Sequence, residues 1–281
     1  MRKAGFFMTA LALIAGAAGF FLRRQEVATV FDPHTGLASP GEPISILLMM
    51  LSGITVLLLF AFCLWIPQRR LSTFEEAFED GGLLSPLLTI LGVLVIFATV
   101  LEAVNVPQRE EFILLAHLQT AGAILSGVCL AYMAIRGPRG GSVAVAAAVP
   151  VFWICLWLVD VHIREASNPV LLRHVYGFFA LSALLLGIYY VASFAFHQGK
   201  VKKLLFTSSV AIYFTGVTMG DVHNFYQRAL LLALAGTLLL YHLALASAVS
   251  RPEPEEPPPY IPPPVSEHKK PFWDVDLDEG E

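Results

Sequence analysis

Two apolar segments of the sequence end in the same tripeptide, Asp-Val-His. The stretch "WLVDVH" carries Asp160 and His162, and the stretch "TMGDVH" carries Asp221 and His223. A carboxylate, an imidazole and an amide oxygen together suit a divalent metal ion or a polar headgroup. With a third acid-terminated segment included, the candidate ligand-binding residues are Glu102, Asp160, His162, Asp221, His223 and Asn224.

Helix geometry limits how these residues could share a ligand. Residues two apart on a helix point in nearly opposite directions, so Asp and His of one motif converge only where the chain is extended. The alternative interpretation needs no ligand. A carboxylate at the carboxyl end of a helix is disfavoured by the macrodipole, and an arginine could offset it. Arg164 has ion-pair spacing to Asp160, while Arg109 and Arg228 follow the other two acids.

The composition indicates that lipid surrounds most of the chain. Of 281 residues, 56% are hydrophobic and 14% are charged, whereas a soluble domain carries about 25% charged residues. So few charges cannot cover a water-facing surface. Because backbone groups in lipid must bond within a helix, we expect an all-α, polytopic transmembrane bundle in contact with the lipid bilayer. No basic cluster is dense enough to predict nucleic-acid binding.

Eight segments have roughly the 20 apolar residues that cross a bilayer. The first shares a basic start and small residues with cleaved signal peptides, but its apolar run continues to Arg23-Arg24 and favours a retained span. The seventh is the shortest and least apolar; without it the count is seven and the C-terminus changes sides. The expected spans are 4–22, 44–66, 83–104, 112–135, 142–162, 174–197, 204–220 and 229–249.

The distribution of Lys and Arg predicts the orientation, because short cytoplasmic loops carry an excess of these residues. With a cytoplasmic N-terminus, ten of them fall inside and six outside, and the "GKVKK" loop alone supplies three lysines. We therefore expect a multi-pass protein of the cell membrane with both termini in the cytoplasm.

The inner loop "RRLSTFEEAFEDGG" has a helical pattern of its own. Ser72 and Glu75 match a capping box, Phe74 and Phe78 fall near one helical face, and Gly81-Gly82 is a natural stop. A short helix is expected here, lying either on the inner leaflet or on the protein itself.

The outer loop after the first span contains turn residues, Asp32-Pro33 and Thr35-Gly36. Its stretch "FDPHTGL" resembles one found in uncharacterised multi-span membrane proteins of anaerobic Gram-positive bacteria. That resemblance implies a bacterial membrane protein and brings no activity, because none is assigned to the group.

The last 31 residues differ from the rest of the chain. They contain eight prolines between Pro252 and Pro264, and residues 250–281 carry nine acids and three bases, a net charge of −6 against −4 for the whole chain. Such a run favours extended polyproline II and cannot form a core. We expect residues 251–281 to be a disordered cytoplasmic tail, either simply solvated or docking a cytoplasmic protein through Tyr260, Phe272 and Trp273.

Three functional classes remain open from the sequence. The favoured class is a non-enzymatic accessory or sensory membrane component. The second is a transporter of a small solute or ion using the polar seventh span, and the third is a membrane enzyme or metal-binding protein using the outer Asp/His cluster. No cofactor is expected, with a divalent metal as the alternative, because neither HExxH nor another catalytic motif is present.

Two further features concern the interior of the bundle. His242 lies well inside the eighth span, either as a hydrogen-bonded core residue or as a functional group. Small residues at positions 123, 127 and 131, and at positions 16 and 19, predict close contacts between helices.

Overall fold

The computed structural model describes residues 3–32, 37, 39, 41–66, 71–78, 82–106, 113–165, 171–221 and 224–251, without the side chains of 165 and 171–174. These residues form helices and connecting turns, and no β-strand occurs among them. The tail expected at 251–281 lies outside the described residues from 252 onward, together with Tyr260, Phe272 and Trp273.

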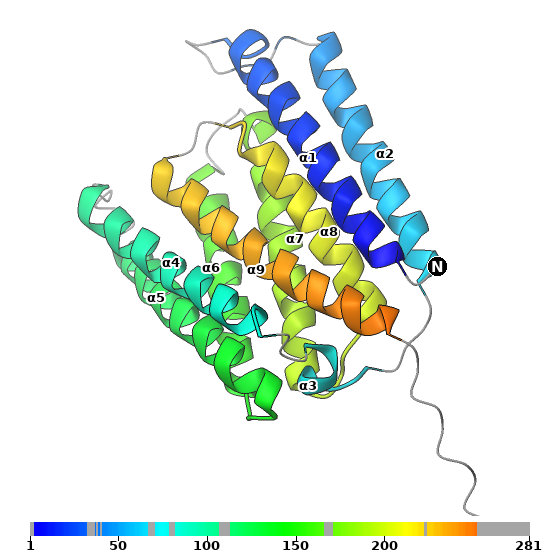
Figure 1. Ribbon diagram of the computed structural model, residues 1–281. Coiled ribbons are helices and arrows are strands. Elements are labelled where there is room, and N and C mark those ends of the chain that lie inside the picture. The colour runs from blue at the N-terminus through cyan, green and yellow to red at the C-terminus, as the bar shows by residue number, and fades with distance from the viewer. Residues whose placement is uncertain are drawn as a thin grey trace, which may run out of the picture. The chain divides into compact units, whose positions relative to one another are not determined.

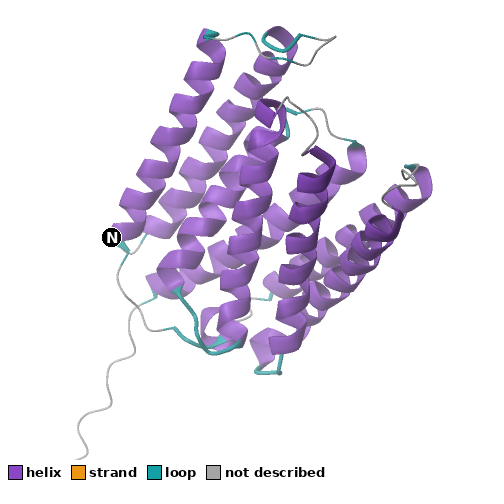
Figure 2. Cartoon of the chain, turned by 180° about the vertical axis from the view of Figure 1, so that it is seen from behind, coloured by secondary structure: helices purple, strands orange, loops and turns teal. Residues whose placement is uncertain are grey.

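Long helices make up the bundle, with two short ones at a single end (Figure 1). Their bounds are α1 Ala4–Thr29, α2 Pro43–Trp65, α3 Phe74–Ala77, α4 Leu84–Asn105, α5 Ile113–Arg136, η2 Gly137–Arg139, α6 Ala144–Glu165, α7 Leu171–Ala195, α8 Val201–Thr218 and α9 Phe225–Ser250. Seen from behind, the turns between the long helices gather at the two ends of the bundle (Figure 2).

Seven helices of the described chain are long and apolar enough to cross a membrane: α1, α2, α4, α5, α6, α7 and α9. The expected all-α, multi-span membrane bundle is therefore confirmed. The remaining long helix, α8, has 18 residues and coincides with the segment expected as the seventh span, but it is not one of these seven helices. It contacts α1, α2, α7 and α9, and twelve of its residues are buried, against five of 23 in α2. Its polar residues thus face other helices instead of lipid.

The first helix is longer than expected. The span predicted at 4–22 continues without a break to Thr29, so Arg23 lies within the helix and not in a loop. The apolar count misplaced this end because charged residues stop a hydropathy run even when a neighbouring helix neutralises them.

Small residues bring the helices close together, as predicted. A Cβ added to Gly127 would lie 2.6 Å from the carbonyl oxygen of Gly92, so α5 and α4 approach at backbone distance. A Cβ on Gly216 would lie 3.0 Å from Cα of Gly16, which places α8 equally close to α1. These contacts replace the hydrophobic driving force that helices lack in lipid.

The short helix predicted after the second span forms, in a different register from the one predicted. Thr73 caps α3 and Glu76 completes the capping box, because the sequence satisfies the pattern twice and Ser72–Glu75 is not the pair used. The Glu76 carboxylate accepts hydrogen bonds from the backbone N–H groups of Ser72 and Thr73. These bonds favour its charged form and lower its pKa, so the cap is complete above that pKa and weakens as the pH falls through it. The helix packs on the protein itself, with Phe74 and Phe78 buried.

Candidate functional site

A buried arginine forms the centre of a group of three charged residues in the described bundle. Arg23 has 1% of its surface exposed, although it lies two turns from the end of α1. Its Nη1 donates to Oε2 of Glu26 at 2.7 Å, and its Nε donates to Oδ1 of Asp221 at 2.5 Å. We call Arg23, Glu26, Thr218 and Asp221 the buried ion cluster.

The carboxyl end of α8 supplies the second half of this cluster. Asp221 follows the last turn of α8, and the Thr218 hydroxyl donates to its Oδ2 at 2.9 Å. The partial negative charge of that helix end disfavours a carboxylate and favours a cation. The Arg23 guanidinium therefore offsets both the macrodipole of α8 and the charge of Asp221. The alternative interpretation of the sequence, which needs no ligand, predicted that an arginine would have this role.

The sequence predicts Arg228, and not Arg23, as the partner of Asp221. Arg228 does not bind the carboxylate of Asp221; its Nη2 donates to the backbone carbonyl of Asp221 at 3.2 Å. The carboxylate is held by Arg23, which lies 198 positions earlier in the chain. The expected pairing of Asp221 with Arg228 is thus corrected: Arg228 binds the backbone of the turn, and Arg23 neutralises the side chain.

Aromatic rings and a glycine enclose the guanidinium. The Arg23 Cζ lies 5.0 Å from the ring centroid of Tyr176 and 5.4 Å from that of Phe31, within cation–π range. A Cβ on Gly220 would lie 2.9 Å from the carbonyl oxygen of Phe20, so only glycine lets the end of α8 come this close to α1. Water is kept away from the ion pairs on these sides.

A pair of side-chain hydroxyl groups joins α2 to α8. The hydroxyl of Ser52 on α2 lies 2.8 Å from the hydroxyl of Tyr213 on α8. Ser52 also donates to the carbonyl of Leu48 in its own helix. Helices α2 and α8 are therefore joined through side-chain hydroxyls.

The energetics favour a structural role for this cluster. Each buried ion loses several kcal/mol of hydration, which is recovered only through close pairing and further hydrogen bonds. Two carboxylates share one guanidinium here, and Thr218 contributes a hydroxyl. Removing one partner of such a group typically costs about 3–5 kcal/mol, because the remaining charge stays buried.

Four other polar residues meet at the neighbouring helix ends, and we call them the rim group. The Asn224 amide donates to Oε1 of Glu102 at 3.2 Å, while its own oxygen caps α9 by accepting from the N–H of Gln227. Arg164 donates to Oδ1 of Asp160 at 2.7 Å, and both residues act electrostatically on Glu102. Glu102, Asp160, Arg164 and Asn224 thus belong to one region at the ends of α4, α6 and α9.

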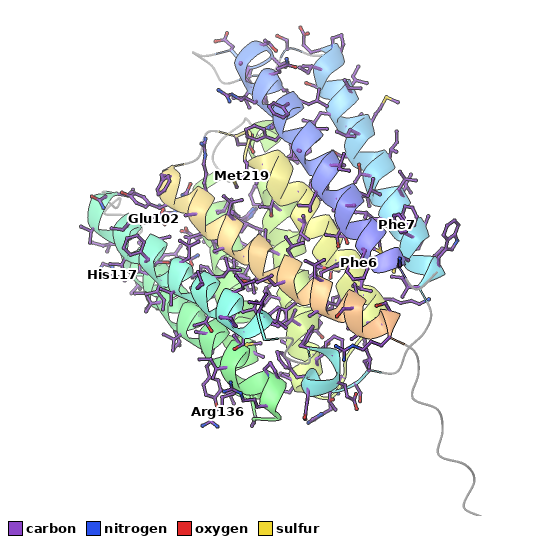
Figure 3. The ribbon with its side chains drawn as sticks, viewed as in Figure 1. Phe6, Phe7, Glu102, His117, Arg136 and Met219 are labelled. Atoms are coloured by element: carbon purple, nitrogen blue, oxygen red, sulfur yellow. The ribbon has the colours of Figure 1, made fainter. Side chains whose placement is uncertain are left out.

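Of the predicted ligand set, the structure brings Glu102 and Asn224 into contact, and the Asp160–Arg164 ion pair is confirmed. His162 does not join them: α6 stays helical to Glu165, so the extended backbone required for Asp160 and His162 to converge is absent there. His162 is exposed, with its ring 6.3 Å from that of Phe178. His223 and Arg109 lie outside the described residues. Figure 3 places Glu102 and His117 near one end of the bundle and Arg136 at the other.

Within the part of the chain that the structure describes, no group of three or more His, Cys, Asp or Glu side chains is arranged to hold a metal ion. Asp221, the acid closest to such a role, is bound to Arg23 and Thr218. The described candidate acids therefore bind arginine, threonine or asparagine of the chain itself.

The sequence prediction missed Arg23, Glu26 and Thr218. One signal was available: the buried residues of α1 include Gly16, Gly19, Arg23 and Glu26, which recur every three or four positions and so lie on one helical face. A charged pair that continues a glycine face is expected to follow that face into the bundle. The partner Asp221 could not be identified from this spacing, since it lies beyond the end of another helix, α8.

His242, the histidine of the eighth expected span, is a core residue. Of the two alternatives predicted from the sequence, this is the hydrogen-bonded core residue. His242 has 0% exposure; its Nδ1 lies 2.7 Å from the Ser208 hydroxyl, and its Nε2 lies 3.0 Å from the carbonyl of Gly5. Both ring nitrogens are therefore satisfied, and they join α9 to α8 and α1.

Comparison with known proteins identified no relative. A scan against protein-family models, a search of curated proteins and a search of solved structures each gave no match to this chain.

Proposed function

We propose that this chain is a non-enzymatic accessory or sensory component of a bacterial cell membrane. The main observation behind the proposal is that the buried charges are paired within the chain. Arg23 of α1 binds both Glu26 of α1 and Asp221 at the end of α8. A transporter keeps charged or polar groups available to its substrate near the midplane. Here the buried ions hold the outer end of the bundle together.

The polar helix α8 supports the same proposal. Thr207, Ser208 and Ser209 donate to carbonyls one turn earlier in their own helix, and Ser208 also contacts His242. These hydroxyls satisfy the helix and its neighbours, which favours a packing role over a substrate path.

We further propose that both termini are cytoplasmic. Lys3, Lys200 and Arg251 lie at the ends of α1, α8 and α9, and Arg136 and Arg139 at the end of α5 and in η2; Figure 1 shows these ends on the side of α3. Because Arg23 is buried in α1, five of the six predicted outer bases remain, and the excess of inner bases is larger than the sequence indicated.

The tail, residues 251–281, is the proposed docking segment for a cytoplasmic protein.

The test compares three tagged chains in native membranes: the full chain, a chain ending at Arg251, and a full chain with Tyr260, Phe272 and Trp273 changed to alanine. We expect one protein to co-purify with the full chain alone, at a constant ratio after detergent exchange. A control with Val265 and Val275 changed to alanine should retain it. Equal recovery of that protein by all four chains would contradict docking by the tail. Solute flux into liposomes that contain the purified bundle would contradict the proposal of a non-transporting component.

A further inference from the structure

The inner end of the bundle contains a buried hydroxyl group that no described residue binds. Tyr241 on α9 has 1% of its surface exposed, and its Oη has no hydrogen-bond partner within the described residues. A buried polar group without a partner destabilises the state that buries it. The position of Tyr241 therefore indicates that the observed arrangement has an alternative in which this hydroxyl reaches water.

The residues that cover Tyr241 belong to α3 and the residue after it. The Phe78 ring centroid lies 4.8 Å from that of Tyr241, and the Phe74 centroid lies 5.9 Å from it, both edge to face. Phe78 also packs on Phe194 of α7 at 5.2 Å. We call residues 73–78 the aromatic plug, because their two rings pack against the ring of Tyr241.

The plug is held by few interactions besides its rings. Its helix has four residues, too few to be stable without support. The polar side is exposed at Glu75 and Glu76, and Glu76 holds the capping box. The Phe74 ring covers Gly137, where a Cβ would overlap it, and the chain turns into α4 through Gly82 at φ +85°. Nothing described here resembles the ion pairs that fix the outer end.

We infer that the aromatic plug is a lid, which opens from the inner end of the bundle and lets water or a ligand hydroxyl reach Tyr241. Closing buries the Phe74 and Phe78 rings and leaves the Tyr241 hydroxyl unpaired. Opening exposes the rings and satisfies the hydroxyl. The unpaired hydroxyl therefore opposes closing, whereas burial of the two rings favours it, and the exchange is independent of the proposed docking by the tail.

The experiment measures how often the plug opens. In a chain whose Cys63, Cys129 and Cys155 are replaced by serine or alanine, Ala77→Cys places a thiol on α3 at a position with 0% exposure. Purified protein in nanodiscs is treated with a membrane-impermeant maleimide. Ala192→Cys, buried in α7, is the reference for a fixed helix, and Glu75→Cys is the reference for an exposed thiol.

We expect the thiol of Ala77→Cys to react at least about tenfold faster than that of Ala192→Cys and more slowly than that of Glu75→Cys, because its reaction requires local opening. Adding Tyr241→Phe removes the unpaired hydroxyl and should slow the reaction about fivefold. Adding Glu76→Gln weakens the cap and should accelerate it, whereas the matched change Glu75→Gln should leave it unchanged.

Two results would overturn the inference. Equal rates for Ala77→Cys and Ala192→Cys would show that the plug is fixed. An unchanged or faster rate with Tyr241→Phe would show that the hydroxyl does not oppose closure. Unchanged melting temperatures in every variant, with a constant rate at Glu75→Cys, confirm that the rates report the plug and not a loss of fold.

Discussion

The two ends of the bundle are closed by different chemistry. At the end that we propose to face outward, the outer end, Arg23 binds Glu26 and Asp221 with hydrogen-bonding distances of 2.5–2.7 Å. At the opposite end, which we propose to be the inner one, Phe74 and Phe78 pack on Tyr241, whose hydroxyl has no partner in the described part of the chain. Ion pairs in a water-excluded site are favourable only with close, well-aligned partners, whereas aromatic rings are held mainly by the apolar area that they bury, with about 0.5–1.5 kcal/mol more from each edge-to-face pair.

The two kinds of contact predict different tolerance to mutation at the two ends of the bundle. The outer end joins helices distant in sequence, α1 and α8, and losing Arg23 leaves two buried carboxylates without their cation. The inner end is covered by a four-residue helix that leaves a polar group unsatisfied. We therefore expect mutations to be costly at the outer end and tolerated at the inner end.

The largest effect is expected at Arg23. Arg23→Met leaves Glu26 and Asp221 buried without their cation and should lower the free energy of unfolding by about 3–5 kcal/mol. Unfolding of the purified bundle in a mixed-micelle titration with SDS measures this loss.

Arg24→Met serves as the matched control, since Arg24 is the next residue of α1 and is exposed. It should change the free energy by less than about 0.5 kcal/mol. Equal losses for the two variants would abolish the proposed difference between the ends.

A smaller effect is expected where α1 and α8 touch. Gly216→Val places side-chain atoms against Gly16, where even a Cβ would lie 3.0 Å from Cα, and should cost about 1–3 kcal/mol through overpacking. Gly53→Val on α2 meets nothing within 4 Å and is the control. The same SDS titration applies, and a neutral Gly216→Val would show that the helices separate without loss.

The smallest effect distinguishes two tyrosines. Tyr213→Phe removes a hydroxyl bonded to Ser52 and should cost about 1 kcal/mol. Tyr241→Phe removes a hydroxyl that no described residue binds and should leave the melting temperature unchanged or raise it. If Tyr241→Phe proved the more destabilising of the two, its hydroxyl would have to be paired after all.

Local patterns predicted part of this structure well. The pairing of Asp160 with Arg164 follows from a spacing of four residues on one helix. The core position of His242 follows from the requirement that a polar group in lipid find partners. Both predictions depend on one helix or on the solvent, and neither needs the arrangement of helices.

Other features depend on that arrangement and could not be read from the sequence. The end of α1 was misplaced because Arg23 is neutralised by Asp221, 198 positions away. The polarity of α8 was read as weakness of a span, whereas α8 is surrounded by four other helices. The capping box of α3 was misplaced by one residue because the sequence offers two equivalent pairs.

The most direct measurement is a double-mutant cycle on Arg23 and Asp221, using Arg23→Met, Asp221→Asn and their combination in the SDS titration. If the cluster fixes the outer end, the double variant should lose less stability than the two single losses added together, by about 1–3 kcal/mol. The reason is that Asp221→Asn, made in a chain that already has Arg23→Met, does not remove a partner from Arg23. Additive losses would contradict the account and would show that Arg23 and Asp221 act independently.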